Sequence, residues 1–391
     1  MRRVQVIPHL AVVLAAVLLV ASCGSSEPQA RPPGATPTST SVPSEPTETP
    51  PTPTPAPSPL DCAALIPDRL ALAQLVLSLA TPAEFDEAVK LFAAGDLGGV
   101  GLLGLPTAED LARLSASPAG PFPLVVASDE EGGPVQRLGP VLGNLPSAAS
   151  LASRPLEEIS ATFEDYGAGL AELGVHVAFA PVVDVGGGPG IGARSFSSDP
   201  ESVIRNAGAV VDGYLAAGIT PVIKHFPGHG GASGDTHQGF ATTRPLDQLR
   251  ERDLIPFAEL ASPDVWVMVG HLLVPGLTDD DVPTSLSPAA IDGLLRREFG
   301  FDGIVITDAL GMGAISNRWP APEASRLALV AGADMVIVNA PYEVVPVLDH
   351  LVASLADGSL SRSSVDDSLV RVLDHKGVDP CEASRRLGSP P

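Results

Sequence analysis

The chain has 391 residues, with 46 Asp and Glu against 23 Lys and Arg, and its formal net charge at pH 7 is −23. This acidic balance argues against a nucleic-acid partner, whose phosphates need a basic surface, and against binding to anionic lipid without a separate anchor. Because 45% of the residues are hydrophobic, disorder over the whole chain is also excluded.

The N-terminus has the pattern of an export signal. Arg2 and Arg3 precede an apolar run over 10–20, which is too short for a transmembrane helix, and small residues then lead to Cys23. The residues Val-Ala-Ser-Cys resemble a bacterial lipobox, in which the cysteine is lipidated and becomes the new N-terminus. We therefore predict a lipoprotein signal peptide over 1–22 and a lipid anchor on Cys23 that holds the protein at the outer face of the cytoplasmic membrane. An ordinary signal peptide is the alternative.

A spacer rich in proline follows. Residues 24–60 contain twelve prolines, many serines and threonines, and no aromatic residue. Such a segment buries too little apolar surface to fold and is typical of an extended, semi-rigid linker. The sequence therefore predicts a disordered tether over 23–60 and one folded domain over 61–391.

Two cysteines remain, Cys62 and Cys381, one near each end of the predicted domain. The ends of a domain often lie close together, and an exported protein meets an oxidising environment. We predict a disulfide between them; two unrelated buried thiols are the alternative.

Within this domain, apolar runs alternate with amphipathic stretches. Seven runs read as strands: 99–103, 124–128, 175–181, 220–225, 265–271, 303–307 and 334–339. Two helices have clear signals: one starts at Asp199-Pro200 and stops at Gly218, and one starts at Ser287-Pro288 and stops at Gly300.

Repeated strand–helix units with nearly continuous apolar strands favour a parallel sheet covered on both faces. We predict a (β/α)8 barrel, with an eighth strand hidden in the irregular segments. A doubly wound open sheet is the alternative, but no G-x-G-x-x-G follows the first strand.

Polar residues gather where the predicted strands end. They are found in 128–133, in 224–230 with 235–237 after it, at His271, and at Thr307-Asp308. In a barrel, all of these positions point to the C-terminal face, where active sites lie. The pattern thus predicts one shared site.

Four segments at these positions resemble glycoside hydrolase family 3, and specifically its single-domain bacterial β-N-acetylglucosaminidases. They are EEGGPVQRL (130–138), KHFPGHG (224–230), DTH (235–237) and GIVITDALGM (303–312). The resemblance spans 70–375. It implies a (β/α)8 barrel that removes non-reducing terminal β-linked GlcNAc with retention, acts on peptidoglycan fragments such as GlcNAc–MurNAc species, and uses no metal or organic cofactor.

The resemblance also implies the catalytic groups. Asp308 matches the family's nucleophile, the carboxylate that forms the glycosyl-enzyme. His237, paired with Asp235, matches the acid/base of the small-domain members; imidazole suits this role because it titrates near neutrality. Without the resemblance, Asp308 would read as a helix cap and His237 as an incidental loop residue.

Five further residues match the family's sugar ligands: Asp129, Arg137, Arg194, Lys224 and His225. Carboxylates accept hydrogen bonds from vicinal hydroxyls, while Arg and Lys donate to sugar oxygens. We interpret His271 as a hydrogen-bonded histidine of the pocket wall.

The sequence departs from the family after the proposed acid/base, where residues 238–240 (Gln-Gly-Phe) replace the usual small-x-Leu-Pro. This departure bears on how the loop closes.

The same residues also suggest three other functions. A metal-dependent hydrolase using His225, His229 and His237 with Asp129 or Asp235 is disfavoured. Pro227-Gly228 prevents the helix that would align the first two histidine rings. A lipoprotein that binds wall fragments without cleaving them is disfavoured by the complete catalytic set. A phosphorylase of the same family stays open, because imidazole repels an anionic acceptor less than a carboxylate does. We expect a monomer.

Overall fold

The structure is a computed structural model that describes residues 56–116 and 119–388. The predicted signal peptide, the lipidation of Cys23 and the tether up to residue 55 lie outside these described residues. No helix among the described residues is both long enough and apolar enough to span a membrane.

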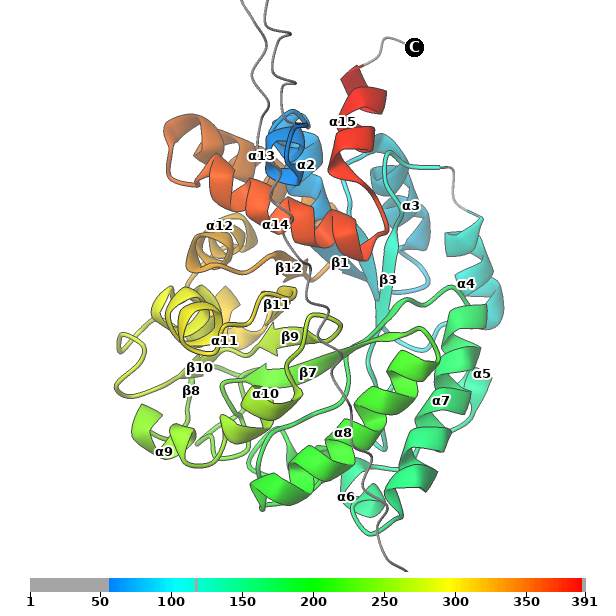
Figure 1. The fold of residues 1–391 in the computed structure, drawn as a ribbon, viewed down its shortest axis with the longest axis vertical. Coiled ribbons are helices and arrows are strands. Elements are labelled where there is room, and N and C mark those ends of the chain that lie inside the picture. Colours follow the sequence, from blue (N-terminus) through cyan, green and yellow to red (C-terminus); the bar gives the residue numbers. More distant parts are fainter. Residues whose placement is uncertain (1–55, 117–118, 389–391) are drawn as a thin grey trace, which may run out of the picture. The chain divides into compact units, whose positions relative to one another are not determined.

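Eight parallel strands close into a barrel in the order β1-β12-β11-β9-β7-β6-β3-β2 (Figure 1). The strands are β1 (Val76–Ala80), β2 (Gly99–Leu102), β3 (Val125–Ser128), β6 (Val177–Ala178), β7 (Thr220–Phe226), β9 (Trp266–Val269), β11 (Val305–Ala309) and β12 (Met335–Val338). Pairing of Val76 with Val336 joins the first strand to the last. The predicted (β/α)8 barrel is therefore confirmed and the open sheet is wrong.

The eighth strand is β1, which precedes the first predicted strand and is not hidden in the irregular segments. It follows the helix α2 (Asp68–Gln74) after the single residue Leu75. The apolar run across helix and strand contains no glycine or proline to mark the change of conformation. Periodicity alone cannot separate a buried strand from a buried helix in such a run.

Helices follow the barrel strands and cover the outside of the barrel (Figure 1). The longer ones are α3 (Phe85–Ala94), α4 (Ala108–Ser115), α7 (Leu156–Glu172), α8 (Pro200–Ala216), α10 (Ile255–Leu260), the π-helix η3 (Ala289–Glu298), α12 (Ala321–Ala331), α13 (Pro341–Asp357), α14 (Arg362–His375) and α15 (Pro380–Gly388).

Both helices with clear sequence signals are present. The carboxylate of Asp199 accepts from the Ser202 N–H at the start of α8, and Gly218 follows that helix with φ 75°. The second is η3, which is followed by Gly300 at φ 70°.

The remaining elements are short and lie mostly in loops after the strands. They are α1 (Pro59–Ala63), α5 (Gly139–Leu142), α6 (Ala148–Leu151), α9 (Leu246–Arg250), α11 (Gly313–Ser316), the 3₁₀ turns η1 (Gly192–Arg194) and η2 (Thr284–Leu286), and the paired strands β4 (Glu130–Gly132) with β5 (Val135–Gln136) and β8 (Ala241–Thr242) with β10 (Leu272–Leu273). Apart from α1, which precedes the first strand, they lie in the loops that follow the strands.

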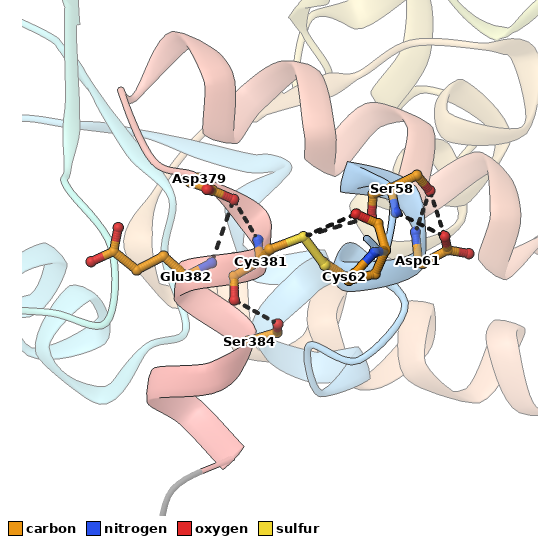
Figure 2. The surroundings of a disulfide bond; sticks show 8 residues. Ser58, Asp61, Cys62, Asp379, Cys381, Glu382 and Ser384 are labelled. Atoms are coloured by element: carbon orange, nitrogen blue, oxygen red, sulfur yellow. Dashed lines mark hydrogen bonds between the residues drawn. A yellow bond between two sulfur atoms is a disulfide. The ribbon is translucent and has the colours of Figure 1, made fainter. Parts of the chain in front are cut away.

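A disulfide joins the two ends of the described domain (Figure 2). It links Cys62 in α1 to Cys381 in α15, with 4.8 Å between their Cα atoms and a sequence separation of 319. A cross-link over so long a loop restricts the unfolded chain and typically stabilises a protein by about 2–4 kcal/mol.

The folded region begins slightly before the predicted boundary at Asp61. Helix α1 starts at Pro59, because Ser58 and Asp61 form a capping box in which each side chain bonds the other residue's backbone N–H. Two residues assigned to the tether, Pro59 and Leu60, are therefore helical.

Candidate active site

One cavity of about 160 Å³ opens at the C-terminal ends of the barrel strands. It brings together all the residues that the sequence analysis selected for catalysis and sugar binding. They are Asp129, Arg137, Arg194, Lys224, His225, Asp235, His237 and Asp308. Phe179, Met268 and Met312 are among the apolar side chains that line the rest of the cavity.

Lys224 is the most deeply buried cation of the cavity, with 2% of its side chain exposed. It lies near the end of β7, and its Nζ contacts Asp129 Oδ1 at 2.8 Å and Glu131 Oε1 at 2.7 Å. Burial opposes its charge, but the two carboxylates outweigh burial and raise the pKa of Lys224. The ammonium is therefore charged at neutral pH.

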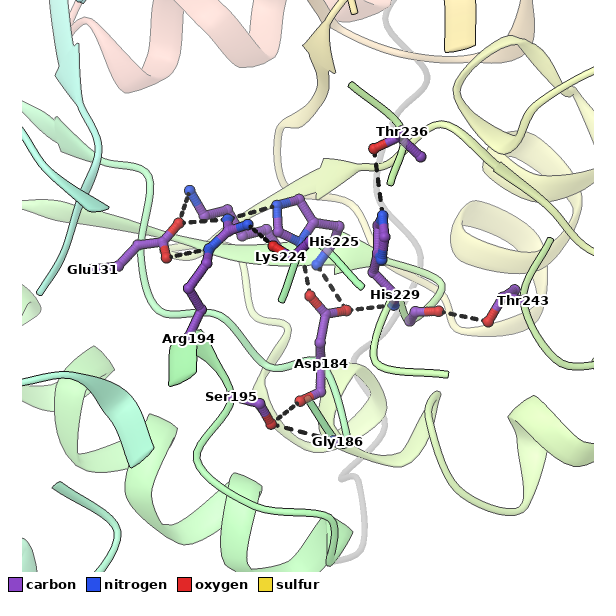
Figure 3. A network of polar contacts seen from close by, with 12 residues as sticks. Glu131, Asp184, Gly186, Arg194, Ser195, Lys224, His225, His229, Thr236 and Thr243 are labelled. Carbon is purple, nitrogen blue, oxygen red and sulfur yellow. Dashed lines mark hydrogen bonds and ion pairs between the residues drawn. The ribbon is translucent and has the colours of Figure 1, made fainter. Parts of the chain in front are cut away.

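Each of these carboxylates also holds an arginine. Asp129 Oδ2 accepts from Arg137 Nη2 at 3.0 Å, and Glu131 forms a two-pronged pair with Arg194 at 2.7 and 2.8 Å (Figure 3). Burial would raise the pKa of both carboxyl groups, but the adjacent cations lower it overall. The result is a fixed row of three cations and two carboxylates.

Glu131 was not among the predicted site residues. It lies in EEGGPVQRL, one of the segments that carried the resemblance, within the short strand β4 that follows β3. Its place in a polar segment at a strand end was the available signal.

Asp184 is a second residue that the sequence analysis missed. Its side chain is fully buried, and it accepts hydrogen bonds from His225 Nδ1 at 2.7 Å, from the His225 N–H at 3.3 Å and from the His229 N–H at 2.5 Å (Figure 3). One carboxylate thus holds both ends of the turn from His225 to His229. Asp184 follows a predicted strand, so its signal was the same strand-end position that selected the other residues.

The carboxylate of Asp184 also sets the orientation of the His225 ring. With Nδ1 donating to this carboxylate, Nε2 is the nitrogen that faces the cavity, 3.3 Å from Arg194 Nη2. Burial would raise the pKa of Asp184, but the His225 imidazole and the backbone N–H of His229 lower it.

Asp308 lies within β11, one residue before its end, rather than after the strand as predicted. Its Oδ1 accepts from the Ala309 N–H at 2.8 Å. Burial would raise the pKa of Asp308, but the imidazoles of His225 and His271, together with this N–H, lower it below its ordinary value. The carboxylate is therefore ionised and held in position by a strand.

Asp235 and His237 form a pair on the loop between β7 and β8. Asp235 Oδ1 lies 2.8 Å from His237 Nδ1 and also accepts from the His237 N–H at 3.0 Å. That backbone hydrogen bond, with the ring contact, lowers the pKa of Asp235 although burial opposes the shift. The opposite ring nitrogen, Nε2, points away from the carboxylate and is available for proton transfer.

Two other histidines, His271 and His229, lie near the cavity, and neither was assigned a catalytic role. His271 is buried, with Nδ1 2.7 Å from Ser285 Oγ and Nε2 3.0 Å from the Ala309 carbonyl. It is hydrogen-bonded as expected, but it lies behind the cavity wall instead of lining it. His229 does line the cavity, and burial lowers its pKa.

The described residues contain no group of three or more His, Cys, Asp or Glu side chains arranged to hold a metal ion. His225 Nδ1 contacts Asp184, and His229 Nε2 lies 3.4 Å from Thr236 Oγ1. These contacts orient the ring of His225 at the end of β7 and that of His229 in the loop that follows.

We predict that Lys224→Met lowers the free energy of unfolding at pH 7 by about 3–5 kcal/mol, because it leaves two buried carboxylates without their shared cation. The deficit should shrink on acidification. In the native protein the lowered pKa values of Asp129 and Glu131 contribute stability above pH ~4, which is lost as pH falls below that value.

In the variant each carboxylate loses one of its two cations, so both pKa values rise towards their unfolded values and the variant loses less stability on acidification. Urea denaturation of both proteins at pH 7 and near pH 4 checks this. Lys90→Met, at a lysine whose side chain is 72% exposed, is the matched control. A deficit that is equal at both pH values would contradict the prediction.

Comparisons with known proteins identify the family. The family described as "Glycosyl hydrolase family 3 N terminal domain" matches residues 84–375. The chain is 42% identical to "Beta-hexosaminidase LpqI" of Mycobacterium tuberculosis (strain ATCC 25618 / H37Rv), over 95% of this chain and 97% of that protein.

Two solved structures have the same fold. That of M. tuberculosis LpqI aligns with a TM-score of 0.76 at 43% identity and covers 84% of this chain and 99% of that chain. A glycosyl hydrolase of the GH3 family from Mycobacterium smegmatis aligns with a TM-score of 0.75 at 43% identity and covers 80% of this chain and 98% of that chain. The chain therefore belongs to glycosyl hydrolase family 3.

Proposed function

We propose that this chain is a retaining exo-β-N-acetylglucosaminidase that releases terminal GlcNAc from peptidoglycan fragments. Relatives with the name beta-hexosaminidase match most of the chain, and the chain is a glycoside hydrolase of the β-N-acetylhexosaminidase type. The observation that supports the mechanism is that an ionised Asp308 and the Asp235–His237 pair line the same cavity.

In the first step of the proposed mechanism, a carboxylate oxygen of Asp308 attacks the anomeric carbon. The glycosidic bond breaks, its electrons stay on the leaving oxygen, and that oxygen takes a proton from His237 Nε2. The lowered pKa of Asp308 supports this role, because a nucleophile must be ionised.

In the second step, neutral His237 accepts a proton from water at Nε2 while the water oxygen attacks the anomeric carbon. The bond to Asp308 breaks and its carboxylate is restored, so two inversions give net retention. Asp235 holds the imidazole by Nδ1 throughout and stabilises its charged form.

The cation row is the proposed site for the sugar hydroxyls. Lys224, Arg137 and Arg194 donate to sugar oxygens, while Asp129 accepts from hydroxyls and His225 presents Nε2. Because these groups are already paired with each other, they are oriented before substrate binds, which avoids ordering them in the transition state. No step of this mechanism needs a metal or an organic cofactor.

Phosphorolysis is the second candidate function. The observation that favours it is the character of the site: the proposed acid/base is an imidazole, and three cations line the same cavity. An incoming phosphate would meet less repulsion here than at a site with a second carboxylate. It would replace water in the second step and give GlcNAc-1-phosphate.

We propose that the protein is exported and held by a lipid on Cys23 at the outer face of the bacterial cytoplasmic membrane, with the site built from a single chain. The basic N-terminus, the short apolar run and the lipobox-like residues support the anchor. We also propose that the protein is a monomer, which light scattering on the purified enzyme tests by measuring its mass in solution.

Cys23→Ser removes the atom that would carry the lipid, so we expect the variant to leave the membrane fraction of expressing cells, in which the native protein should be retained. Immunoblotting of cell fractions measures this. Equal retention of both proteins by membranes would refute the lipid anchor.

The catalytic assignment predicts different behaviour for two variants. Asp308→Ala is expected to abolish turnover of every β-GlcNAc substrate. His237→Ala should lower kcat/KM by about 10²–10⁴-fold for an alkyl or sugar leaving group, which needs a proton, and far less for a dinitrophenyl leaving group, which does not.

Both variants are assayed beside His350→Ala, which removes a histidine that pairs with Glu323 on the outer helices at 3.0 Å. This control should retain full activity. Equal losses on both substrate types in His237→Ala would rule out its acid/base role.

The substrate assignment is tested on purified muropeptides that carry a terminal GlcNAc. We expect free GlcNAc and the trimmed fragment, at a rate that does not depend on phosphate. Mass spectrometry of the products, with and without phosphate, distinguishes the candidates. GlcNAc-1-phosphate would establish the phosphorylase, and tight binding without turnover would establish a binding protein.

A further inference from the structure

The loop that carries the Asp235–His237 pair is docked on the segment that follows the strand of Asp308. The Gly313 N–H donates to the His237 carbonyl at 3.2 Å, and the Ala314 N–H donates to the Thr236 carbonyl at 3.0 Å. Both donors lie in the first turn of α11, where N–H groups have no partner within the helix. The loop backbone therefore completes the start of this short helix.

The two backbones are in direct contact at Gly313. A Cβ built on this glycine would lie 2.8 Å from the His237 carbonyl oxygen and 2.8 Å from the Gln238 carbonyl carbon. Real Cβ atoms do not approach backbone atoms so closely, so any other residue would displace the loop. The φ angle of Gly313 is not left-handed. A glycine is therefore needed at this position because of the close contact with the loop and not because of the backbone conformation.

A side-chain contact secures the far end of the loop. The Arg318 guanidinium lies 5.4 Å from the ring centre of Phe240 and 5.3 Å from that of Trp319, and the two rings are 6.4 Å apart. Arg318 is held in turn by Asp281, 3.0 Å away. Phe240, which is 37% exposed, thus contacts the residues just after α11, through a cation–π contact with Arg318 and an aromatic contact with Trp319.

The segment over 309–314, which the loop contacts, is itself held close to the proposed nucleophile. Gly313 follows Asp308 by five residues. Between them, the Ala309 carbonyl contacts His271 Nε2 at 3.0 Å and the Gly311 N–H donates to Asn339 Oδ1 at 3.0 Å. A displacement of the loop relative to this segment would therefore move His237 relative to Asp308.

We propose that Phe240 and Gly313 are positioning residues, which hold the loop so that His237 Nε2 meets the leaving oxygen while Asp308 attacks. Gly313 sets how closely the loop approaches, and Phe240 locks its end through Arg318. This inference rests on the proposed role of His237. It also gives a function to Phe240, which lies where the sequence departs from the family pattern.

The test compares Phe240→Ala with Phe240→Tyr and with Leu215→Ala. Leu215 has the same 37% exposure but lies in α8, away from the loop. Each protein is assayed on an alkyl β-GlcNAc glycoside and on the dinitrophenyl glycoside, well below its Tm. We expect Phe240→Ala to lose about 10- to 100-fold in kcat/KM on the alkyl glycoside and much less on the dinitrophenyl glycoside, because a misplaced acid matters only when the leaving group needs a proton.

Phe240→Tyr keeps an aromatic face for Arg318 and should restore the rate, while Leu215→Ala should match the native enzyme on both substrates. Gly313→Ala reaches the same contact from the other side and should reproduce the selectivity of Phe240→Ala. A loss that is equal on the two substrates, or no loss at all, overturns the proposal. The result for His237→Ala distinguishes a failure of the positioning role from a failure of the acid/base role. If His237→Ala loses more on the alkyl glycoside than on the dinitrophenyl glycoside and Phe240→Ala does not, only the positioning role fails. If neither is selective, the acid/base assignment fails with it.

Discussion

The site depends on the need to neutralise a buried ammonium group. Lys224 is held inside the mouth of the barrel, where an unpaired charge would cost several kcal/mol. Asp129 and Glu131 surround it, and each of them is held by an arginine. Because each carboxylate bonds two cations, every member of this row is held by its neighbours, and the sugar-binding groups are oriented before substrate arrives.

Asp184 extends this constraint to the loop that follows. Its buried carboxylate binds the His225 ring, the His225 N–H and the His229 N–H, so the turn between these histidines is closed around one side chain. The loop can then leave the barrel and return with Asp235 and His237 above the cavity. The fixed charge row and the exposed loop are thus two parts of one structure, joined at His225 and His229.

The catalytic geometry is shared between a rigid element and a loop. Asp308 lies in a barrel strand, whereas His237 lies on a loop with 65% of its side chain exposed. A proton donor on a loop needs a fixed support to be placed accurately. The first turn of α11, which follows the same strand, contacts the loop backbone and provides that support.

The features that could be predicted from the sequence are those whose signals lie in neighbouring residues of the chain. The strand runs, the Asp199-Pro200 helix start and the strand-end motifs each depend on neighbouring residues, so the barrel and the positions of Asp308, Lys224 and His237 could be predicted. Strand β1 could not be, because its apolar run is continuous with that of α2 and no turn residue separates them. Asp184 and Glu131 shared the strand-end signal, but a buried carboxylate is recognised only when its partners are known.

By itself, the amino-acid sequence determined the alternation of strands and helices, the residue types at the strand ends and the presence of two cysteines in the domain. Only the tertiary structure decided which groups meet. Closure of the barrel brings Asp129, Lys224 and Asp308 from three different strand ends into one cavity. Contacts such as Lys224 with Glu131, or Gly313 with the loop of His237, join residues far apart in the chain. Their energy depends on burial and distance, which the linear order of residues does not contain.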